Sequence, residues 1–555
     1  MTRNGVSTVS KSRRGIFRIT DTCRAELERH LYKRYPDREW GTFFRFGFRR
    51  CGWGVALTFV DGLWPGPGDL RRDSPIVTIN SEYTLRAVDS VSDSPFGIGM
   101  VHSHPEGAGT LPSSLDDDMD GYYPKLFEDY SPGRPYCSLI LSRSVNGDFR
   151  FTGRMFVDGQ WLPVDELLTV GDVLQREAAQ CGNFVLNQTH MNGTLASSPV
   201  ESVTARLETL LGRASAQRLC DATVAVVGCS GTGSPAIEAL ARAGVGHFVL
   251  VDPQRFAASN LERMHGSTFA DATVENPPYK VEIMTRMIHE INPVADVTPI
   301  VGNILDELVL DEMLRADLIL SCTDTQHSRA ALGDFAAHYL LPSIDVGVVF
   351  EGAKGVVNGQ IGQFTQFRPD QPCGFCDGMI NPNALAAELM TDEEKESRRQ
   401  AAREADALGI DGAQYWRGDT PPLITVGYLT SAVGSLAAGY AIGWLTGKFS
   451  MPHARFQFDI GVPCFGFVDV ERHVIATCSC GRTIGHADQG RAERSVSKPA
   501  HWPKAFLCRS KTTFERNALA GKANSLAKRF FRQARSYLLK AFCGVGWRSR
   551  QRVAP

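Results

Sequence analysis

One stretch, Ala222 to Asp252, constrains the fold of this chain more than any other. It reads ATVAVVGCSGTGSPAIEALARAGVGHFVLVD: an apolar run, a glycine-rich turn, a helical pattern and a second apolar run. This order predicts a strand, a helix and a second strand parallel to the first. Since parallel strands joined by helices build sheets covered on both faces, we expect a doubly wound, Rossmann-like α/β domain over residues 203–485.

The turn itself predicts a nucleotide site. Gly228, Gly231 and Gly233 lie between the first strand and the helix. Glycines let the backbone approach a phosphate, and the helix start offers free N–H groups and the positive end of its dipole. Asp252, at the end of the next strand, suits the hydroxyls of a ribose. These features alone fit a nicotinamide-dependent oxidoreductase equally well.

The sequence that follows favours a different nucleotide chemistry. The segments LVDPQRFAASNLERM, NPPYKVEIMTRMIHEINP and DLILSCTDTQHSRAAL follow in order. They resemble the MoeB/ThiF family, the adenylating domain of ubiquitin-activating enzymes. The resemblance implies ATP and Mg²⁺ as cofactors. It also implies that Arg263 and Lys280 contact the triphosphate, Asn260 helps to place it, Asp252 holds the ribose and Asp324 organises magnesium.

The same resemblance implies partners. A ubiquitin-like protein with a C-terminal glycine would be the substrate, and a conjugating enzyme or a sulfur carrier would be a further partner. A homodimer through the adenylating domain is expected, because Arg206 matches an arginine that the family donates across its dimer. The alternative for Arg206 is a solvated charge on a helix.

Two cysteine pairs form a candidate structural zinc site. Cys373 and Cys376 lie in QPCGFCDG, and Cys478 and Cys480 lie in ATCSCGRT. Four thiolates satisfy a closed tetrahedral zinc site. The resemblance implies a structural zinc there, although the second pair of the family is usually Cys-x-x-Cys. Unrelated thiols are the alternative.

A cysteine is absent from residues 377–423. Relatives that pass their product to a thiol carry a cysteine between the first zinc pair and the long apolar helix. We therefore expect no thioester at that position, with Cys464 in GVPCFGF as an alternative acceptor.

The stretch GMVHSHPEGAGTLPSSLDDDMDG, Gly99 to Gly121, suggests a second metal site. Alternation along a strand places His102 and His104 on one face, where two imidazoles and a carboxylate can hold a catalytic zinc. Without further context, an ordinary polar loop explains two such histidines as well. The run His-x-His-Pro followed by Ser-x-x-Asp resembles the JAMM (MPN-plus) metalloproteases.

That second resemblance assigns roles to five residues. It implies that His102, His104 and Asp116 bind zinc, that Glu39 is the general acid/base, and that Ser113 helps to hold the oxyanion. The gap before Asp116 is one residue longer than usual, which leaves Asp117 as a competing ligand. The fold implied for residues 1–170 is an α+β, cytidine-deaminase-like JAMM domain.

Composition sets the remaining expectations. We expect a linker at 171–202 and a basic amphipathic tail at 486–555, since Lys and Arg concentrate there although the formal net charge is only −2. The tail suits a partner groove, an acidic surface, a membrane or its own domain; we predict no nucleic-acid partner. No secretory signal is visible, so we expect a cytoplasmic protein. The uncharged stretch 424–447 is diluted by small residues and should be a buried core helix rather than a membrane span.

The two motif sets predict a fusion enzyme. One part would adenylate the C-terminal glycine of a ubiquitin-like protein with ATP. The other, a zinc isopeptidase or peptidase, would trim that protein or remove it from a conjugate, as in bacterial ubiquitin-like conjugation or sulfur-transfer systems. The alternatives are an adenylating scaffold with a degenerate N-terminal domain and, less in keeping with Arg263, Lys280 and Asp324, a nicotinamide-dependent oxidoreductase.

Overall fold

The structure is a computed structural model that describes residues 14–34, 37–71, 76–180, 204–353, 355–414, 416, 424–462 and 466–508. The chain divides into two compact units, Met1–Phe506 and Leu507–Pro555. The helix expected in the basic tail, with Leu519, Leu526, Phe530, Tyr537 and Leu538, lies outside the described residues, as does Cys464.

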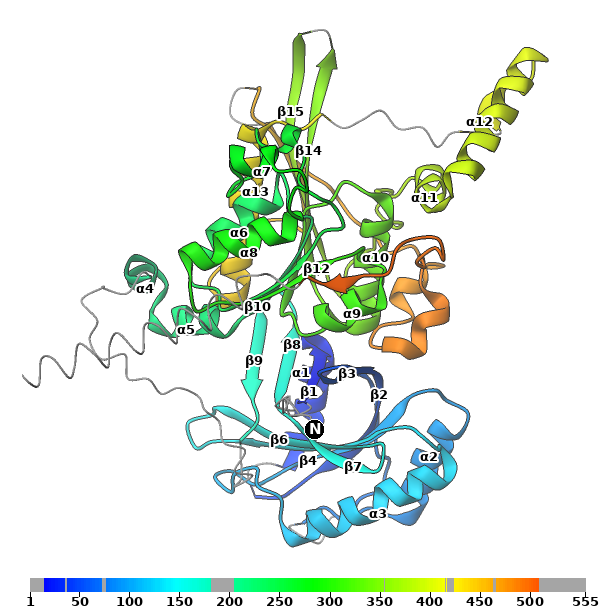
Figure 1. The fold of residues 1–555 in the computed structure, drawn as a ribbon. Coiled ribbons are helices and arrows are strands. Elements are labelled where there is room, and N and C mark those ends of the chain that lie inside the picture. Colours follow the sequence, from blue (N-terminus) through cyan, green and yellow to red (C-terminus); the bar gives the residue numbers. More distant parts are fainter. Residues whose placement is uncertain are drawn as a thin grey trace, which may run out of the picture. The chain divides into compact units, whose positions relative to one another are not determined.

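The described residues of the first 180 positions form a nine-stranded sheet in the order β7-β6-β5-β4-β2-β3-β1-β8-β9 (Figure 1). The strands are β1 Arg14–Thr20, β2 Gly41–Cys51, β3 Gly54–Leu63, β4 Gly97–Ser103, β5 Tyr136–Arg143, β6 Phe149–Val157, β7 Gln160–Val164, β8 Glu166–Val170 and β9 Leu174–Ala178. The helices are α1 Asp21–Leu31, α2 Ser81–Ser92 and α3 Ser114–Tyr130.

The centre of this sheet is buried on both faces. The side chains of Phe44 and Phe46 pack into one apolar cluster, whereas Phe43 belongs to a second cluster with Tyr123 and Phe127 of α3. Strand β4 lies between β2 and β5 and pairs with β5 in parallel. The end of β4, which carries His102 and is followed directly by His104, is therefore held by strands on both sides.

A second nine-stranded sheet follows in the order β17-β16-β15-β14-β13-β10-β11-β12-β18. Its strands are β10 Thr223–Val227, β11 His247–Val251, β12 Asp296–Val301, β13 Leu318–Ser321, β14 Ser343–Ala353, β15 Val356–Phe367, β16 Arg455–Asp459, β17 Gly466–Asp469 and β18 Phe506–Leu507. The five adjacent strands β12, β11, β10, β13 and β14 pair in parallel. Strands β15, β16 and β17 continue the sheet beyond β14 in antiparallel pairing.

Helices cover both faces of the parallel part, with α6, α8 and α13 on one face and α9 and α10 on the other (Figure 1). The helices are α4 Ala205–Leu211, α5 Arg213–Asp221, α6 Gly233–Arg242, α7 Phe269–Thr273, α8 Lys280–Ile291, α9 Glu307–Met313, α10 Gln326–Tyr339, α11 Pro382–Leu389, α12 Asp392–Ala407 and α13 Gly427–Thr446. This is the doubly wound α/β arrangement that the strand–helix–strand stretch predicts.

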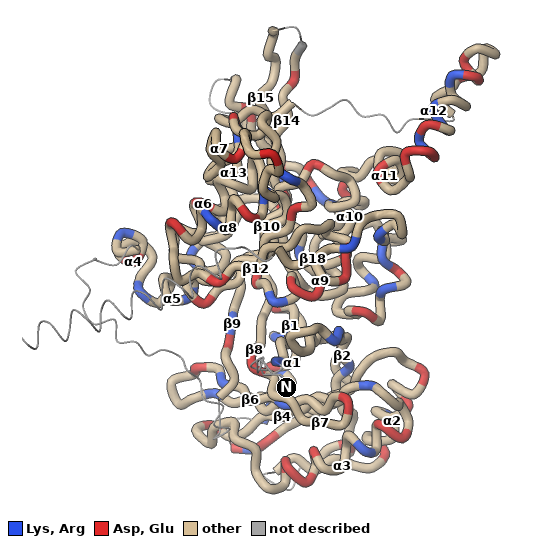
Figure 2. Tube along the Cα trace, in the orientation of Figure 1, with Lys and Arg blue, Asp and Glu red and all other residues tan. Residues whose placement is uncertain are grey.

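Helix α13 corresponds to the long uncharged stretch of the sequence. Its residues Leu429, Val433, Ala437 and Ala441 are fully buried, and the helix packs on α6 and β14. Within the described part of the chain, no helix has the length and apolar character needed to cross a membrane. By contrast, α12 is mostly exposed and carries both acidic and basic residues along its length (Figure 2).

Buried arginines join segments of the first unit that are far apart in sequence. Arg18 of β1, only 1% exposed, donates to Leu314 O at 2.8 Å and to Ala316 O at 3.0 Å. Burial lowers the pKa of Arg18 to about 10. Arg49 of β2 pairs with Glu307 at 2.9 Å and Asp488 at 3.1 Å. Residues just after 485 therefore pack within the first unit. The boundaries expected from the sequence, at about residues 170, 203 and 485, stay predictions.

Candidate functional site

The glycine turn is built at the carboxyl edge of the parallel strands. Gly228 directly follows β10 and has φ +91°, a conformation that favours glycine. A Cβ atom there would lie 2.6 Å from Cys322 O, and a Cβ at Gly233 would lie 1.9 Å from Gly228 O. The turn therefore closes tightly between the end of β13 and the start of α6, with space for glycine only.

Asp252 holds this turn from the end of the neighbouring strand β11. Asp252 is 5% exposed, and its carboxylate accepts the N–H groups of Cys229 at 2.9 Å and Gln254 at 2.8 Å. Burial raises the pKa of Asp252, and the charge of Lys280 only partly offsets that effect. Lys280 Nζ donates to Gln254 Oε1 at 2.6 Å, so the ammonium group is placed beside the turn by a neutral partner.

Arg263 approaches the turn from the loop after β11. Its Cδ atom lies 3.4 Å from the position of a Cβ at Gly231, and its guanidinium donates to Thr425 O at 3.2 Å. Asn260 is buried and uses its Oδ1 to accept the N–H of Ala257 at 3.0 Å, which closes its own turn. Arg263 and the glycine turn are thus in contact, and Asn260 shapes the loop that brings Arg263 there.

The two remaining residues that the sequence predicts for the nucleotide site, Asp324 and Arg206, are exposed. Asp324 follows β13 by three positions and therefore lies at the same carboxyl edge as Gly228 and Asp252. Arg206 lies on α4, which precedes the sheet. The structure places Asp324 with the other predicted nucleotide residues at one edge, whereas Arg206 is on a separate helix.

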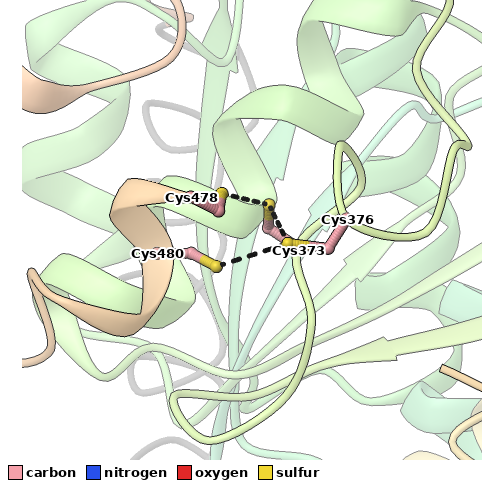
Figure 3. A group of neighbouring side chains, drawn as sticks. All are labelled: Cys373, Cys376, Cys478 and Cys480. Carbon is pink, nitrogen blue, oxygen red and sulfur yellow. Dashed lines mark hydrogen bonds between the residues drawn. The ribbon is translucent and has the colours of Figure 1, made fainter. Parts of the chain in front are cut away.

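The two cysteine pairs meet, although about a hundred residues separate them in sequence. The Sγ atom of Cys373 lies 3.8 Å from that of Cys376 and 3.6 Å from that of Cys478, and Cys376 Sγ lies 3.8 Å from Cys480 Sγ (Figure 3). All four sulfur atoms lie within 4.8 Å of one another. Four thiols converging on one point match the donor set and number of a structural zinc site.

His102 of β4 and His104, the residue directly after β4, gather with one aspartate of α3. His102 Nε2 lies 3.1 Å from Asp116 Oδ1, and His104 Nε2 lies 3.5 Å from Asp116 Oδ2. Burial disfavours the charged forms of both Asp116 and His104. The contacts with the histidines nevertheless lower the pKa of Asp116, and the contacts with Asp116 and Glu39 raise the pKa of His104.

His102 is the part of this cluster that best fits a metal. It is 1% exposed, and neither ring nitrogen has a hydrogen-bond partner among the described residues, because its approach to Asp116 lacks hydrogen-bonding geometry. A buried polar atom without a partner is costly. A zinc ion between His102, His104 and Asp116 would satisfy the imidazole with ligands of the usual catalytic type.

Helix geometry separates Asp116 from its competitor Asp117. Ser113 is the N-cap of α3: its Oγ accepts the Asp116 N–H at 3.3 Å, and its own N–H donates to Asp116 Oδ2 at 2.6 Å. This capping box turns Asp116 towards the histidines. Asp117 is exposed and pairs with Arg154 at 2.8 Å. The structure therefore brings Asp116, and not Asp117, to the cluster.

Glu39 lies just before β2, at the edge of the same cluster. Its Oε1 is 4.0 Å from His104 Nε2, and its Oε2 accepts the N–H of Val77 at 3.1 Å. A carboxylate at this range could exchange a proton with a water held between the two groups. Ser113 is exposed, and the hydrogen of its hydroxyl is not used by the capping bond.

A cavity of about 570 Å³ lies among α9, α10 and residues 491–505. Its lining includes Asp306, Asp334, Arg494 and Lys498, and none of the residues that the motifs single out. Sequence reasoning also missed His265, which interacts with Glu238 and Ser431. The only signal for His265 is its position two residues after Arg263.

The part of the chain that forms the second sheet is similar to known proteins. The ThiF family model matches residues 204–472. The molybdopterin-synthase adenylyltransferase of Salmonella typhimurium is 34% identical over 170 residues, which are 30% of this chain and 64% of that protein. The Escherichia coli protein of the same name is 37% identical over 173 residues, with the same shares covered. The sulfur carrier protein ThiS adenylyltransferase of E. coli is 30% identical over 141 residues. The aligned residues are 25% of this chain and 55% of that protein.

Among solved structures, E. coli MccB with ATP is similar at a TM-score of 0.36 and 17% identity, over 50% of this chain and 74% of that one. The chain spans less than two thirds of the length of the curated relatives above. The C-terminal part of the chain contains a ThiF/MoeB-like adenylyltransferase domain of Rossmann type.

Proposed function

We propose that the chain uses ATP to adenylate the C-terminal glycine of a ubiquitin-like protein. The observation that carries the proposal is the gathering of the glycine turn, Asp252, Lys280 and Arg263 at one sheet edge. Cations from side chains, rather than a platform for a nicotinamide ring, are what a triphosphate requires. The relatives named for molybdopterin synthase and for the sulfur carrier ThiS support a small protein as the substrate class.

The chemistry joins a carboxylate to the α-phosphorus of ATP. The glycine carboxylate forms the new P–O bond, the bond between the α-phosphorus and the bridging oxygen breaks, and pyrophosphate leaves with the electron pair. Arg263, Lys280 and the N–H groups of the turn would offset the negative charge that accumulates on the phosphate oxygens. Asp324 would hold Mg²⁺ beside the triphosphate, and Asp252 would accept from the ribose.

The acyl-adenylate would then leave without an internal thioester at the usual position, since residues 377–423 contain no cysteine. A thiol on a conjugating enzyme or in a sulfur-transfer partner would accept the acyl group. We propose a homodimer in which Arg206 of each chain serves the site of the other. A structural zinc would be held by Cys373, Cys376, Cys478 and Cys480.

A second activity is favoured by the buried cluster of His102, His104 and Asp116. We propose that it is a JAMM-like zinc peptidase that trims the ubiquitin-like protein or releases it from a conjugate. When bound, zinc would lower the pKa of a water molecule towards neutrality. Glu39 would take a proton from that water and deliver it to the leaving nitrogen, and Ser113 would donate to the carbonyl oxygen.

The test is exchange of labelled pyrophosphate into ATP by the full chain. Candidate substrates are small ubiquitin-like proteins encoded beside its gene, each with a matched version that lacks the terminal glycine. We expect exchange with the intact protein and none with the shortened one. Absence of exchange with every such candidate would contradict the adenylation proposal.

Two simpler measurements separate the alternatives. A nicotinamide-dependent oxidoreductase would bind NADH more tightly than ATP. An adenylating scaffold with a degenerate N-terminal domain would bind fewer than two zinc ions per chain, and His102→Ala would leave that number unchanged.

A further inference from the structure

A chain of three side chains lies beside Arg263. His265 Nδ1 is 2.8 Å from Glu238 Oε2 of α6, and His265 Nε2 is 2.9 Å from Ser431 Oγ of α13. None of the three is fully exposed. His265 thus bridges the helix that follows the glycine turn and the long core helix, two residues beyond Arg263.

The direction of these hydrogen bonds follows from the carboxylate. Burial disfavours the charged form of Glu238, but its hydrogen bonds with His265 and Arg242 outweigh burial and lower the pKa. An ionised carboxylate only accepts, so Nδ1 of His265 carries the proton. In the neutral imidazole, Nε2 then accepts from the Ser431 hydroxyl, and one tautomer and one ring orientation are selected.

The same loop is held at two further points. The N–H of His265 donates to Ser234 Oγ of α6 at 2.9 Å, and Glu262 Oε1 accepts the N–H of Gly427, the first residue of α13, at 2.7 Å. Arg263 therefore lies between two residues that are each tied to a helix. Its own guanidinium donates to Thr425 O.

The order serine, histidine, carboxylate is also that of a hydrolytic triad. Ser431, however, lies inside α13, and the preceding Thr430 already donates its N–H to Val426 O at 3.2 Å. The backbone N–H groups that would hold an oxyanion are therefore engaged in the helix. The arrangement suits support of a neighbour better than nucleophilic attack.

We propose that His265 is a positioning residue for Arg263: with Glu238 and Ser431, it holds the Arg263 loop so that the guanidinium meets the triphosphate against the glycine turn. This inference rests on the proposed adenylation function. Preorganising a long cationic side chain removes the entropy cost of ordering it when ATP binds.

The test is a double-mutant cycle on ATP affinity, measured by calorimetric titration of the full chain with Mg²⁺ and a non-hydrolysable ATP analogue. His265→Ala should weaken binding about tenfold when Arg263 is present and less than about twofold in Arg263→Ala, because coupled residues are not additive. Ser431→Ala is a milder variant, in which the Glu238 bond remains, and it should give a smaller loss of the same kind. His247→Ala, on the amino end of β11, is the matched histidine control and should leave affinity unchanged.

Thermal unfolding of every variant separates support of the fold from support of Arg263. A lower melting temperature with unchanged ATP affinity would overturn the inference, as would equal losses from His265→Ala in both backgrounds. If His265→Ala does not fold, the same double-mutant cycle is measured with Ser431→Ala and Arg263→Ala, and equal losses in both backgrounds would overturn the inference. Failure of the wild-type chain to bind ATP would refute the proposed function and this inference together, whereas binding with additive losses would refute this inference alone.

Discussion

Replacing Gly233 with alanine should cost both stability and nucleotide affinity. The new Cβ would lie 1.9 Å from Gly228 O. Since Cβ atoms essentially never lie within 3.0 Å of another heavy atom, the turn has to move by about 1 Å or more. Overpacking of this kind costs about 1–3 kcal/mol. A displacement of that size also moves the N–H groups of the turn, to which the proposal assigns phosphate binding, and we expect it to weaken ATP binding by about 100-fold.

Gly439 of α13 offers a matched control. It is also a helical glycine, but a Cβ there meets nothing within 4 Å. Gly439→Ala should therefore stabilise the chain by about 0.5–1 kcal/mol and leave ATP affinity unchanged. Urea unfolding midpoints and calorimetric ATP titrations measure both effects. Wild-type affinity in Gly233→Ala, or equal losses in the two variants, would refute the reasoning.

Further predictions concern metals and pH. Asp116→Ala should reduce bound zinc by one ion per chain by elemental analysis, whereas Asp117→Ala should not; equal zinc in both would contradict the His-rich site. Cys376→Ser should lose one zinc ion and lower the unfolding midpoint, and Cys220→Ser, which removes an exposed cysteine, should do neither. Burial raises the pKa of Asp334 to about 7 from 3.8, so the folded chain holds a proton that the unfolded chain releases. Its contribution to stability should fall as pH rises from about 4 to 7. Asp334→Asn should remove that part of the slope in urea unfolding midpoints, and an unchanged slope would contradict the assignment.

The sequence predicted the parallel core because the pattern of strand, turn and helix lies within one run of consecutive residues. The strand, turn and helix from Ala222 to Asp252 need only neighbouring residues to form. Gly228 and Gly233 lie where close backbone contact requires glycine, whereas Gly231 faces side chains only. Whether Asp116 or Asp117 faces the histidines could not be decided from spacing. Neighbouring residues of a helix point about 100° apart, and the capping box with Ser113 turns Asp116 rather than Asp117 towards the histidines.

Contacts between distant segments were beyond the reach of sequence patterns. Arg18 reads as an exposed charge in a strand, yet its partners are Leu314 O and Ala316 O, almost three hundred positions away. The link of His265 to Glu238 and Ser431 similarly depends on how α6 and α13 pack. The four cysteines were predicted as a set by residue type, because thiols that bind one zinc keep short spacings within each pair.

The central claim is that side-chain cations at the sheet edge hold a triphosphate for acyl transfer. Its most direct test compares Mg²⁺-dependent ATP binding by the wild-type chain with binding by the double variant Arg263→Ala/Lys280→Ala. We expect the double variant to bind ATP at least about 100-fold more weakly, since each lost charge-assisted contact is worth about 1.5–3 kcal/mol. Equal affinity of the two proteins for ATP would contradict the account.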